Sequence, residues 1–234
     1  MSETRVPTSH GDGRSHTFRA RRPIATLLLS HGAGAGVGSR DLQALARDLP
    51  RNGITVVLFD QPWVLAGRRV AGPPATLDDG LRAAAARLRP TTPLVVGGRS
   101  AGARSAARCA TALGAAGCLA LAFPLHPPGR PGRSRLDELA GAGVRTLVVQ
   151  GERDPFGGPD EFPDDLDHVD MSVVPGGDHG FAVPQRGPVT QDEVDGIVVE
   201  AALEWIVRDV VGNQPTSGRV GRTCSHFWTA PGPL

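Results

Sequence analysis

The stretch Gly97–Gly102 (GGRSAG) decides how this chain is interpreted. Its last five residues match G-x-S-x-G, a pattern that places a serine on a sharp turn between a strand and a helix. Glycine is abundant, with 31 in 234 residues, so such a match also arises by chance. The tripeptide GRS recurs at Ser15 and at Ser134 without the final glycine. The surroundings of Ser100 must therefore decide whether it is a nucleophile.

The residues on either side of Ser100 favour a nucleophile elbow. The apolar run Leu94–Gly97 is typical of a short buried strand, and small residues predict a helix over Ala101–Leu113. The turn between them is so tight that the neighbouring side chains must be very small. Gly98, Ala101 and Gly102 meet that requirement.

Strands and helices are expected to alternate along most of the chain. Short apolar runs predict strands over residues 24–30, 54–60, 94–97, 118–123, 145–150 and 171–174. Helices are expected after a Ser39 cap, after the box-like pair Thr76 and Asp79, over 101–113, near 136–140, and after the box formed by Thr190 and Glu193. This order predicts an α/β fold, a three-layer sandwich whose mostly parallel sheet has helices on both faces.

The chain divides into three parts by pattern. Residues 1–22 are polar and are expected to form an edge hairpin or a disordered arm. Residues 23–211 carry the regular pattern and suffice for one domain with its own core. Residues 212–234 have no periodicity and are expected to be a disordered tail.

Composition and charge argue against several classes of protein. The formal net charge is +1, which argues against a nucleic-acid partner. No apolar run is long enough to span a bilayer, and the N-terminus lacks the apolar segment of a signal peptide. The three cysteines are widely spaced and form no metal-binding pair. We expect a cytoplasmic monomer or homodimer that acts on a small molecule, without metal or cofactor.

A serine hydroxyl needs a base, and the base needs a carboxylate to orient it. His179, in GGDHGF, follows the last expected strand, and Asp154, in GERDPFG, follows the one before it. The order serine, acid, histidine is the one found in α/β-hydrolases. Asp178 adjoins His179 and is poorly placed to contact it, whereas Asp60 at the end of the second strand remains an alternative acid.

An oxyanion hole needs two backbone N–H groups. The first is expected from Ala101, the residue after the serine. The second is expected from the His31–Gly34 loop (HGAG) after the first buried strand, with Ala33 as the first choice and Gly34 close behind.

Several apolar residues near strand ends are candidates for an acyl pocket. They are Trp63, Leu125, Phe156 and Phe181. His126, in PLHPP, is either a substrate contact or a residue that braces its loop, and bracing is the favoured interpretation. The segment between Phe123 and Asp154 is too short for a large lid, so we expect an open site.

Five blocks in order resemble the α/β-hydrolase superfamily over about residues 23–211. They are LLLSHGAG, VVGGRSAGAR, FPLHPPGRP, LVVQGERDPFG and GGDHGF, and the PLHPP portion is the most distinctive. The closest resemblance is to the small cap-less group related to dienelactone hydrolases, which also contains the testis-expressed and NSL-complex-subunit hydrolase-like proteins. The resemblance implies the fold and the triad Ser100, Asp154 and His179. Family members often carry Met and Gly where this chain has Ala101 and Ala103.

Other classes fit less well. A dinucleotide-binding loop would need glycine where the chain has Val37 or Ser39, and the absence of lysine excludes a P-loop. The remaining alternative is an α/β-hydrolase-like binding or scaffold protein with an idle triad. The favoured hypothesis is a serine hydrolase that cleaves an ester or thioester, with lactones and small amides as further candidates.

Overall fold

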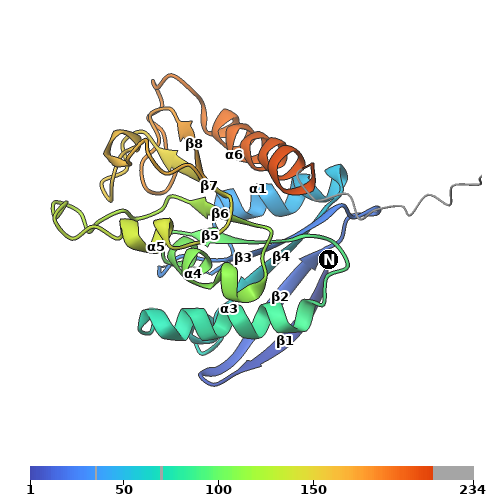
Figure 1. Ribbon diagram of the computed structural model, residues 1–234. Coiled ribbons are helices and arrows are strands. Elements are labelled where there is room, and N and C mark those ends of the chain that lie inside the picture. The colour runs from blue at the N-terminus through green and yellow to red at the C-terminus, as the bar shows by residue number, and fades with distance from the viewer. Residues whose placement is uncertain (35, 69–70, 213–234) are drawn as a thin grey trace, which may run out of the picture.

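The computed structural model of the protein describes residues 1–34, 36–68 and 71–212. One eight-stranded sheet has the order β1-β2-β4-β3-β5-β6-β7-β8 (Figure 1). The strands are β1 Ser2–Thr8, β2 Gly11–Phe18, β3 Ala25–Ser30, β4 Ile54–Asp60, β5 Leu94–Arg99, β6 Gly117–Leu121, β7 Thr146–Gly151 and β8 Val169–Val174. The strands β3 to β8 run parallel, while β2 pairs antiparallel with β1 and β4. The mostly parallel sheet expected from the sequence is therefore confirmed.

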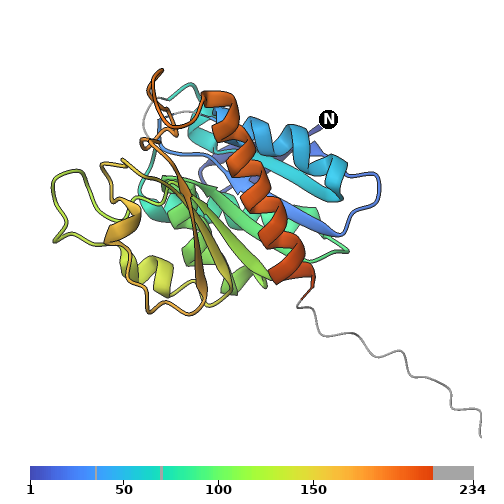
Figure 2. The same ribbon diagram turned by 90° about the horizontal axis from the view of Figure 1, so that it is seen from above.

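Helices cover both faces of the sheet. They are α1 Arg40–Asp48, α2 Pro62–Leu65, α3 Pro74–Leu88, α4 Ala101–Cys109, α5 Leu136–Ala140 and α6 Gln191–Trp205. Helices α1 and α6 pack together on one face, and α3, α4 and α5 lie on the other (Figures 1 and 2). Between β6 and β7 the described chain has only α5 and two loops, over residues 122–135 and 141–145. The fold is the expected three-layer sandwich without a large cap.

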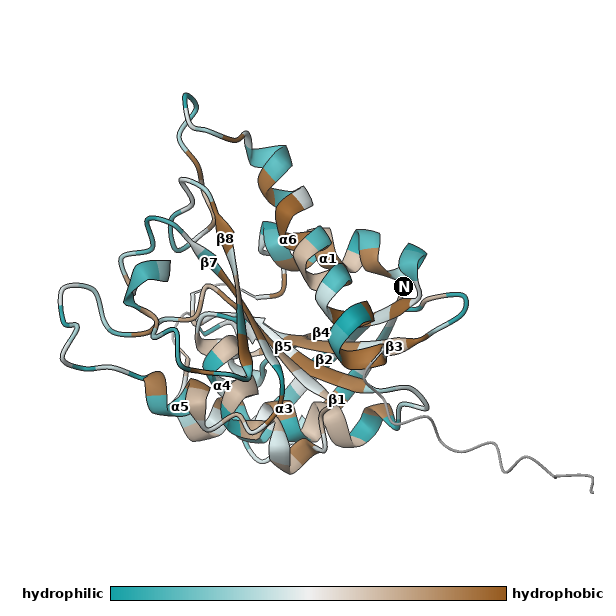
Figure 3. Cartoon of the chain, turned by 45° about the horizontal axis from the view of Figure 1, so that its top comes forward, coloured by the Kyte–Doolittle hydropathy of each residue, from teal (hydrophilic) through white to brown (hydrophobic). Residues whose placement is uncertain are grey.

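The inner strands are largely apolar because both of their faces are covered. All six residues of β3 are buried. Successive side chains alternate between faces, so Leu27 and Leu29 pack with α1 and α6 while Leu28 packs with α3 and α4. The hydropathy colouring shows the strands as a brown centre with hydrophilic residues on the outer faces of the helices (Figure 3). Burial on two faces explains the uninterrupted apolar runs in the sequence.

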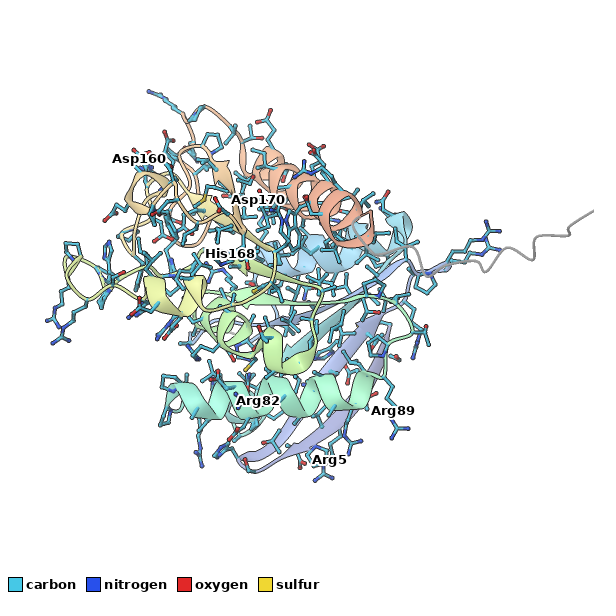
Figure 4. All side chains as sticks on the ribbon, in the orientation of Figure 1. Arg5, Arg82, Arg89, Asp160, His168 and Asp170 are labelled. Atoms are coloured by element: carbon cyan, nitrogen blue, oxygen red, sulfur yellow. The ribbon has the colours of Figure 1, made fainter. Side chains whose placement is uncertain are left out.

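Residues 1–22 contain the hairpin of β1 and β2, one of the two states left open by the sequence. In the antiparallel register Arg14 lies opposite Asp60, so the hairpin turn extends beyond the carboxyl end of β4. Side chains such as Arg5 on the hairpin and Arg89 at the end of α3 project away from the body of the protein (Figure 4). None of the described helices is both long and apolar enough to cross a bilayer.

The helix starts differ in part from the expectation. The Thr190 and Glu193 side chains form the expected reciprocal box at the start of α6. Thr76 does not cap α3, because that helix begins at Pro74 and the Thr76 hydroxyl donates to the Pro73 carbonyl at 2.7 Å. Ser39 holds the N-cap position of α1, but its side chain makes no capping bond.

Several further boundaries were wrong by two to four residues. Strand β5 ends at Arg99 instead of Gly97, and β8 begins at Val169 instead of Met171. Strand β6 ends at Leu121, two residues before the expected end. The helix expected over 101–113 ends at Cys109, and a separate 3-10 turn follows at Thr111–Leu113. The tail expected from residue 212 lies outside the described residues except for Gly212.

Candidate active site

Ser100 lies on the sharp turn between β5 and α4. Its φ of 52° falls in the left-handed region, which is costly for a residue with a side chain. Its backbone N–H donates to the Leu121 carbonyl of the neighbouring strand at 2.9 Å, which fixes the strained turn to the sheet. The side chain is thereby raised above the carboxyl edge of the sheet, as the G-x-S-x-G pattern predicts.

The glycines of the motif are required by a close approach of β3. A Cβ on Gly98 would lie 2.5 Å from the Ser30 carbonyl oxygen and 2.6 Å from the Gly102 carbonyl carbon. A Cβ on Gly102 would overlap the carbonyl oxygens of Ser30 and His31. The elbow therefore accepts no side chain at either position.

The variant Gly102→Ala is expected to lower the free energy of unfolding by about 1–3 kcal/mol, because backbone must move to admit the methyl group. Gly196→Ala in α6 is the matched control, since nothing lies within 4 Å of its added Cβ. That control should gain about 0.5–1 kcal/mol from helix propensity. Urea denaturation measures the change in the free energy of unfolding in each variant and shows whether it is negative for Gly102→Ala and positive for Gly196→Ala. Equal effects would contradict the steric account of the motif.

The structure brings three side chains from separate strand ends into one hydrogen-bonded chain. His179 Nε2 lies 2.9 Å from Ser100 Oγ, and His179 Nδ1 lies 2.8 Å from Asp154 Oδ2. The ionised carboxylate can only accept, so Nδ1–H donates to Asp154 and Nε2 accepts the serine O–H. The Asp154 side chain is fully buried, while that of His179 is 20% exposed. This arrangement can move a proton away from a hydroxyl that solvent can reach.

Gln150 orients the carboxylate, and the sequence analysis missed it. Its Nε2 donates to Asp154 Oδ2 at 3.0 Å and to the Gly157 carbonyl at 2.8 Å, and the side chain is buried. The Phe156 N–H donates to the other carboxylate oxygen at 2.8 Å. A polar residue at the end of the otherwise apolar strand β7 was the signal available in the sequence.

The two alternative acids have other partners. Asp60 Oδ2 lies 2.8 Å from the His16 ring of the hairpin, and its Oδ1 accepts the Val37 N–H at 3.1 Å. Asp178 accepts the backbone N–H groups of Gly180 and Ala182 at 2.7 and 2.9 Å. These bonds hold loops in place and leave Asp154 as the carboxylate on His179.

The HGAG loop lies against the serine. A Cβ on Gly32 would be 3.4 Å from Ser100 Cβ, so the loop and the elbow are in contact range. The buried His31 ring holds the loop in place. Its Nδ1 lies 2.7 Å from the Gly32 carbonyl oxygen, and its Nε2 accepts the backbone N–H of Gln61 at 3.0 Å. Ala33 and Gly34 follow on the exposed side of this loop.

Ala101 supplies the amide at the start of α4. The first N–H groups of a helix have no intrahelical acceptor, and they lie at its positive end. This position is suited to stabilising negative charge next to the Ser100 side chain.

The residues predicted to line the pocket lie in different surroundings. The Phe156 ring lies on the His179 ring, with centroids 4.2 Å apart, and so belongs to the site. His126 braces its loop, because Nε2 lies 2.8 Å from Glu161 and Nδ1 lies 2.9 Å from the Pro127 carbonyl. The Pro127 carbonyl and then the Glu161 carboxylate raise the pKa of His126 above its usual value, since both accept from the ring.

Leu125 and Phe181, the other two apolar residues predicted for the pocket, are buried. Leu125 is 4% exposed and packs with α3, α4 and α5, while Phe181 is 2% exposed in the core beneath α1 and α6. Both side chains contribute to the hydrophobic core.

Trp63 lines a cavity next to the HGAG loop. Its ring meets the His31 ring edge to face at 5.1 Å. The cavity, about 540 Å³, is lined by His10, Gly11, Asp12, Pro62, Trp63, Leu65, Ala66, Arg68, Gly72, Pro73 and Thr76. Among the described residues, the wall of this cavity does not include Ser100.

No described cysteine competes with Ser100 as a nucleophile. Burial raises the pKa of Cys109 to about 11 and that of Cys118 to about 12, so both remain protonated thiols near neutral pH. Cys224 lies outside the described residues. No group of three potential metal ligands occurs in the described part of the chain.

Solved structures of other proteins share this fold. No curated protein matches the chain. A lid-less α/β serine hydrolase from Xanthomonas campestris superimposes with a TM-score of 0.67 at 22% identity, covering 87% of this chain and 94% of that one. A dienelactone hydrolase from Anabaena variabilis gives 0.68 at 18% identity, with 89% and 97% covered. A putative α/β hydrolase from Agrobacterium tumefaciens gives 0.71 at 16% identity, with 91% and 98% covered.

A family model described as an alpha/beta hydrolase domain matches residues 23–207, which include every residue of the hydrogen-bonded chain described above. The matched segment begins just before β3 and ends beyond α6. The protein therefore belongs to the α/β-hydrolase domain family.

Proposed function

We propose that this protein is a serine hydrolase that cleaves an ester or thioester by way of an acyl-enzyme. The observation that carries the proposal is the continuous chain from Ser100 Oγ to His179 and on to the buried Asp154, with links of 2.9 and 2.8 Å. A serine, a base and an orienting acid within hydrogen-bond reach are the requirements for nucleophilic catalysis. Membership of a hydrolase family supports the same conclusion.

In the proposed mechanism Ser100 Oγ attacks the acyl carbon while His179 Nε2 takes the hydroxyl proton. Asp154 stabilises the imidazolium that forms. The N–H groups of Ala101 and Ala33, with Gly34 as the adjacent alternative, receive the negative oxygen of the tetrahedral intermediate. His179 then returns the proton to the leaving group.

Water completes the cycle. His179 removes a proton from a water molecule, whose oxygen attacks the acyl carbon of the acyl-enzyme. When the second tetrahedral intermediate breaks down, the proton returns to Ser100 Oγ and the carboxylic acid leaves. The residues of the chain suffice for every step, so the mechanism uses no cofactor.

The proposed substrate is a small acyl compound, an ester or thioester first and a lactone or small amide next. The absence of a large cap over the described site supports an open cleft that admits small or exposed groups. The similarity to a dienelactone hydrolase supports including lactones. Phe156, on the face of His179, is proposed as an apolar contact for the substrate.

A fluorophosphonate probe tests the proposal directly. It should label the wild-type protein covalently and leave Ser100→Ala unlabelled. Competition by p-nitrophenyl esters of increasing acyl length, by thioesters and by lactones then ranks the substrate classes. A folded wild-type protein that stays unlabelled would favour the alternative, a binding or scaffold protein with an idle triad.

A further inference from the structure

The side chain of Arg99 connects the serine elbow to the histidine loop. Arg99 is the last residue of β5 and directly precedes Ser100. Its Nη2 donates to the backbone carbonyl of His179 at 2.6 Å. The guanidinium also borders the HGAG loop, since Nη1 would lie 3.6 Å from a Cβ on Gly32. One side chain thus contacts two loops that hold proposed catalytic groups.

Asp41, in the first turn of α1, holds the guanidinium in this position. Its Oδ2 lies 3.1 Å from Arg99 Nε, and the two side chains are 5% and 17% exposed. Neither of these two atoms has an aligned hydrogen-bond partner among the described residues, so the contact is an ion pair. A pair so poorly exposed is weakly screened by solvent, and it neutralises the arginine charge near His179.

We propose that Arg99 is a positioning residue that sets the location of His179 relative to Ser100, with Asp41 as its anchor. Its effect on rate rests on the proposed function. Asp154 and Phe156 restrain the imidazole ring. Arg99 restrains the backbone of the same residue, and it does so from the position adjacent to the nucleophile. A shift of the histidine loop is thereby coupled to the elbow itself.

The physical basis is the steep dependence of proton transfer on geometry. A displacement of about 1 Å at a reacting group can cost about 100-fold in rate. The fork of a guanidinium can hold the His179 carbonyl with one nitrogen and face Asp41 with another, which a lysine ammonium cannot reproduce with the same geometry. Asp41 also neutralises the positive charge of Arg99, so the guanidinium does not repel the imidazolium that forms on His179 in the transition state.

The first test compares two arginines of similar exposure. Arg108 is 21% exposed and pairs with Asp78 and Glu138 on the far side of the sheet from α1, without contact to His179. The test variant is Arg99→Met with Asp41→Asn, and the control is Arg108→Met with Asp78→Asn. Neither leaves a buried carboxylate without its arginine, because Glu138 keeps its pair with Arg104. Melting temperatures show the stability cost of each.

We expect kcat for p-nitrophenyl acetate to be about 10- to 100-fold lower in the Arg99→Met, Asp41→Asn variant, with little change in KM. The control should keep kcat even if it melts at a lower temperature. Arg99→Lys should recover part of the loss, and ethylguanidinium should partly restore Arg99→Ala. A kcat unchanged in the Arg99 variant, or lowered equally in the control, would overturn the proposal.

A second readout does not depend on turnover. The Nδ1–H proton of His179, bonded to Asp154, should give a downfield proton NMR signal that disappears in His179→Gln. The signal should shift or broaden in the Arg99→Met, Asp41→Asn variant and stay in place in the Arg108 control variant. An unchanged signal would refute the positioning role whether or not the protein is a hydrolase, so the two proposals fail separately.

Discussion

Replacing Ser100 and His179 together by alanine is expected to lower kcat no further than replacing either one alone. Each single variant should lose about 10⁶-fold, because nucleophile and base act as one unit. The 2.9 Å contact between Ser100 Oγ and His179 Nε2 is the structural reason. Without the base the hydroxyl keeps its proton, and without the hydroxyl the base has no proton to take.

The measurement is kcat for p-nitrophenyl acetate in the wild type, the two single variants and the double variant. Circular dichroism establishes that all four are folded, which we expect because Ser100 and His179 lie at the carboxyl edge and outside the core. Losses that add in the double variant would mean that the two residues act independently. In that case the proposed mechanism would be wrong.

Asp154→Asn is expected to lower kcat by about 10⁴-fold while the fold survives. An amide at this position can donate to His179 Nδ1, which favours the wrong tautomer of the ring. With its oxygen toward Gln150 and His179, the new side chain would place its NH2 against the Phe156 N–H. With its NH2 toward His179 it would meet the Gln150 NH2 and donate to Nδ1, so that Nε2 carries the ring proton and cannot accept the Ser100 proton.

Asp60→Asn is the matched control. Asp60 is also a buried carboxylate at a strand end beside a histidine, but its partners are His16 and the Val37 N–H. We expect its variant to keep kcat within about one order of magnitude, because its contacts reach the site only through the glycine loop. A larger loss in Asp60→Asn than in Asp154→Asn would reassign the acid.

The fold was largely predictable from local patterns. Apolar runs identified the six parallel strands, because a strand covered on both faces is largely apolar. The edge strand β8 is the exception, since Met171 and Val173 are 37% and 40% exposed. The Thr190 box is local too, since a cap involves groups only three residues apart. The start of α3 was wrongly predicted after Thr76, because Pro74, two residues earlier, is itself a favoured first helical residue.

The sequence predicted the three side chains that the structure brings together, but it did not predict the residues that hold them in place. Ser100, Asp154 and His179 follow strand ends in the expected order, and parallel strands bring their carboxyl ends to one edge. Arg99 was missed because its role is a contact with a residue 80 positions away. Gln150 was missed although Asp154 is only four residues away, because its role depends on the side chain turning toward that carboxylate. Leu125 and Phe181 follow strand ends too, yet their side chains turn into the two cores.

The sequence by itself determined the order of the strands along the chain, the elbow at GGRSAG, and a histidine at a later strand end, with Asp154 favoured and Asp60 left as an alternative acid. Those features depend on residue type and local spacing. Only the tertiary structure decided that Asp154, not Asp60, lies on His179, and that Arg99 joins the elbow to the histidine loop. The physical reason is that a hydrogen bond requires atoms within about 3 Å, and the positions of residues 80 apart are set by the packing of the whole sheet.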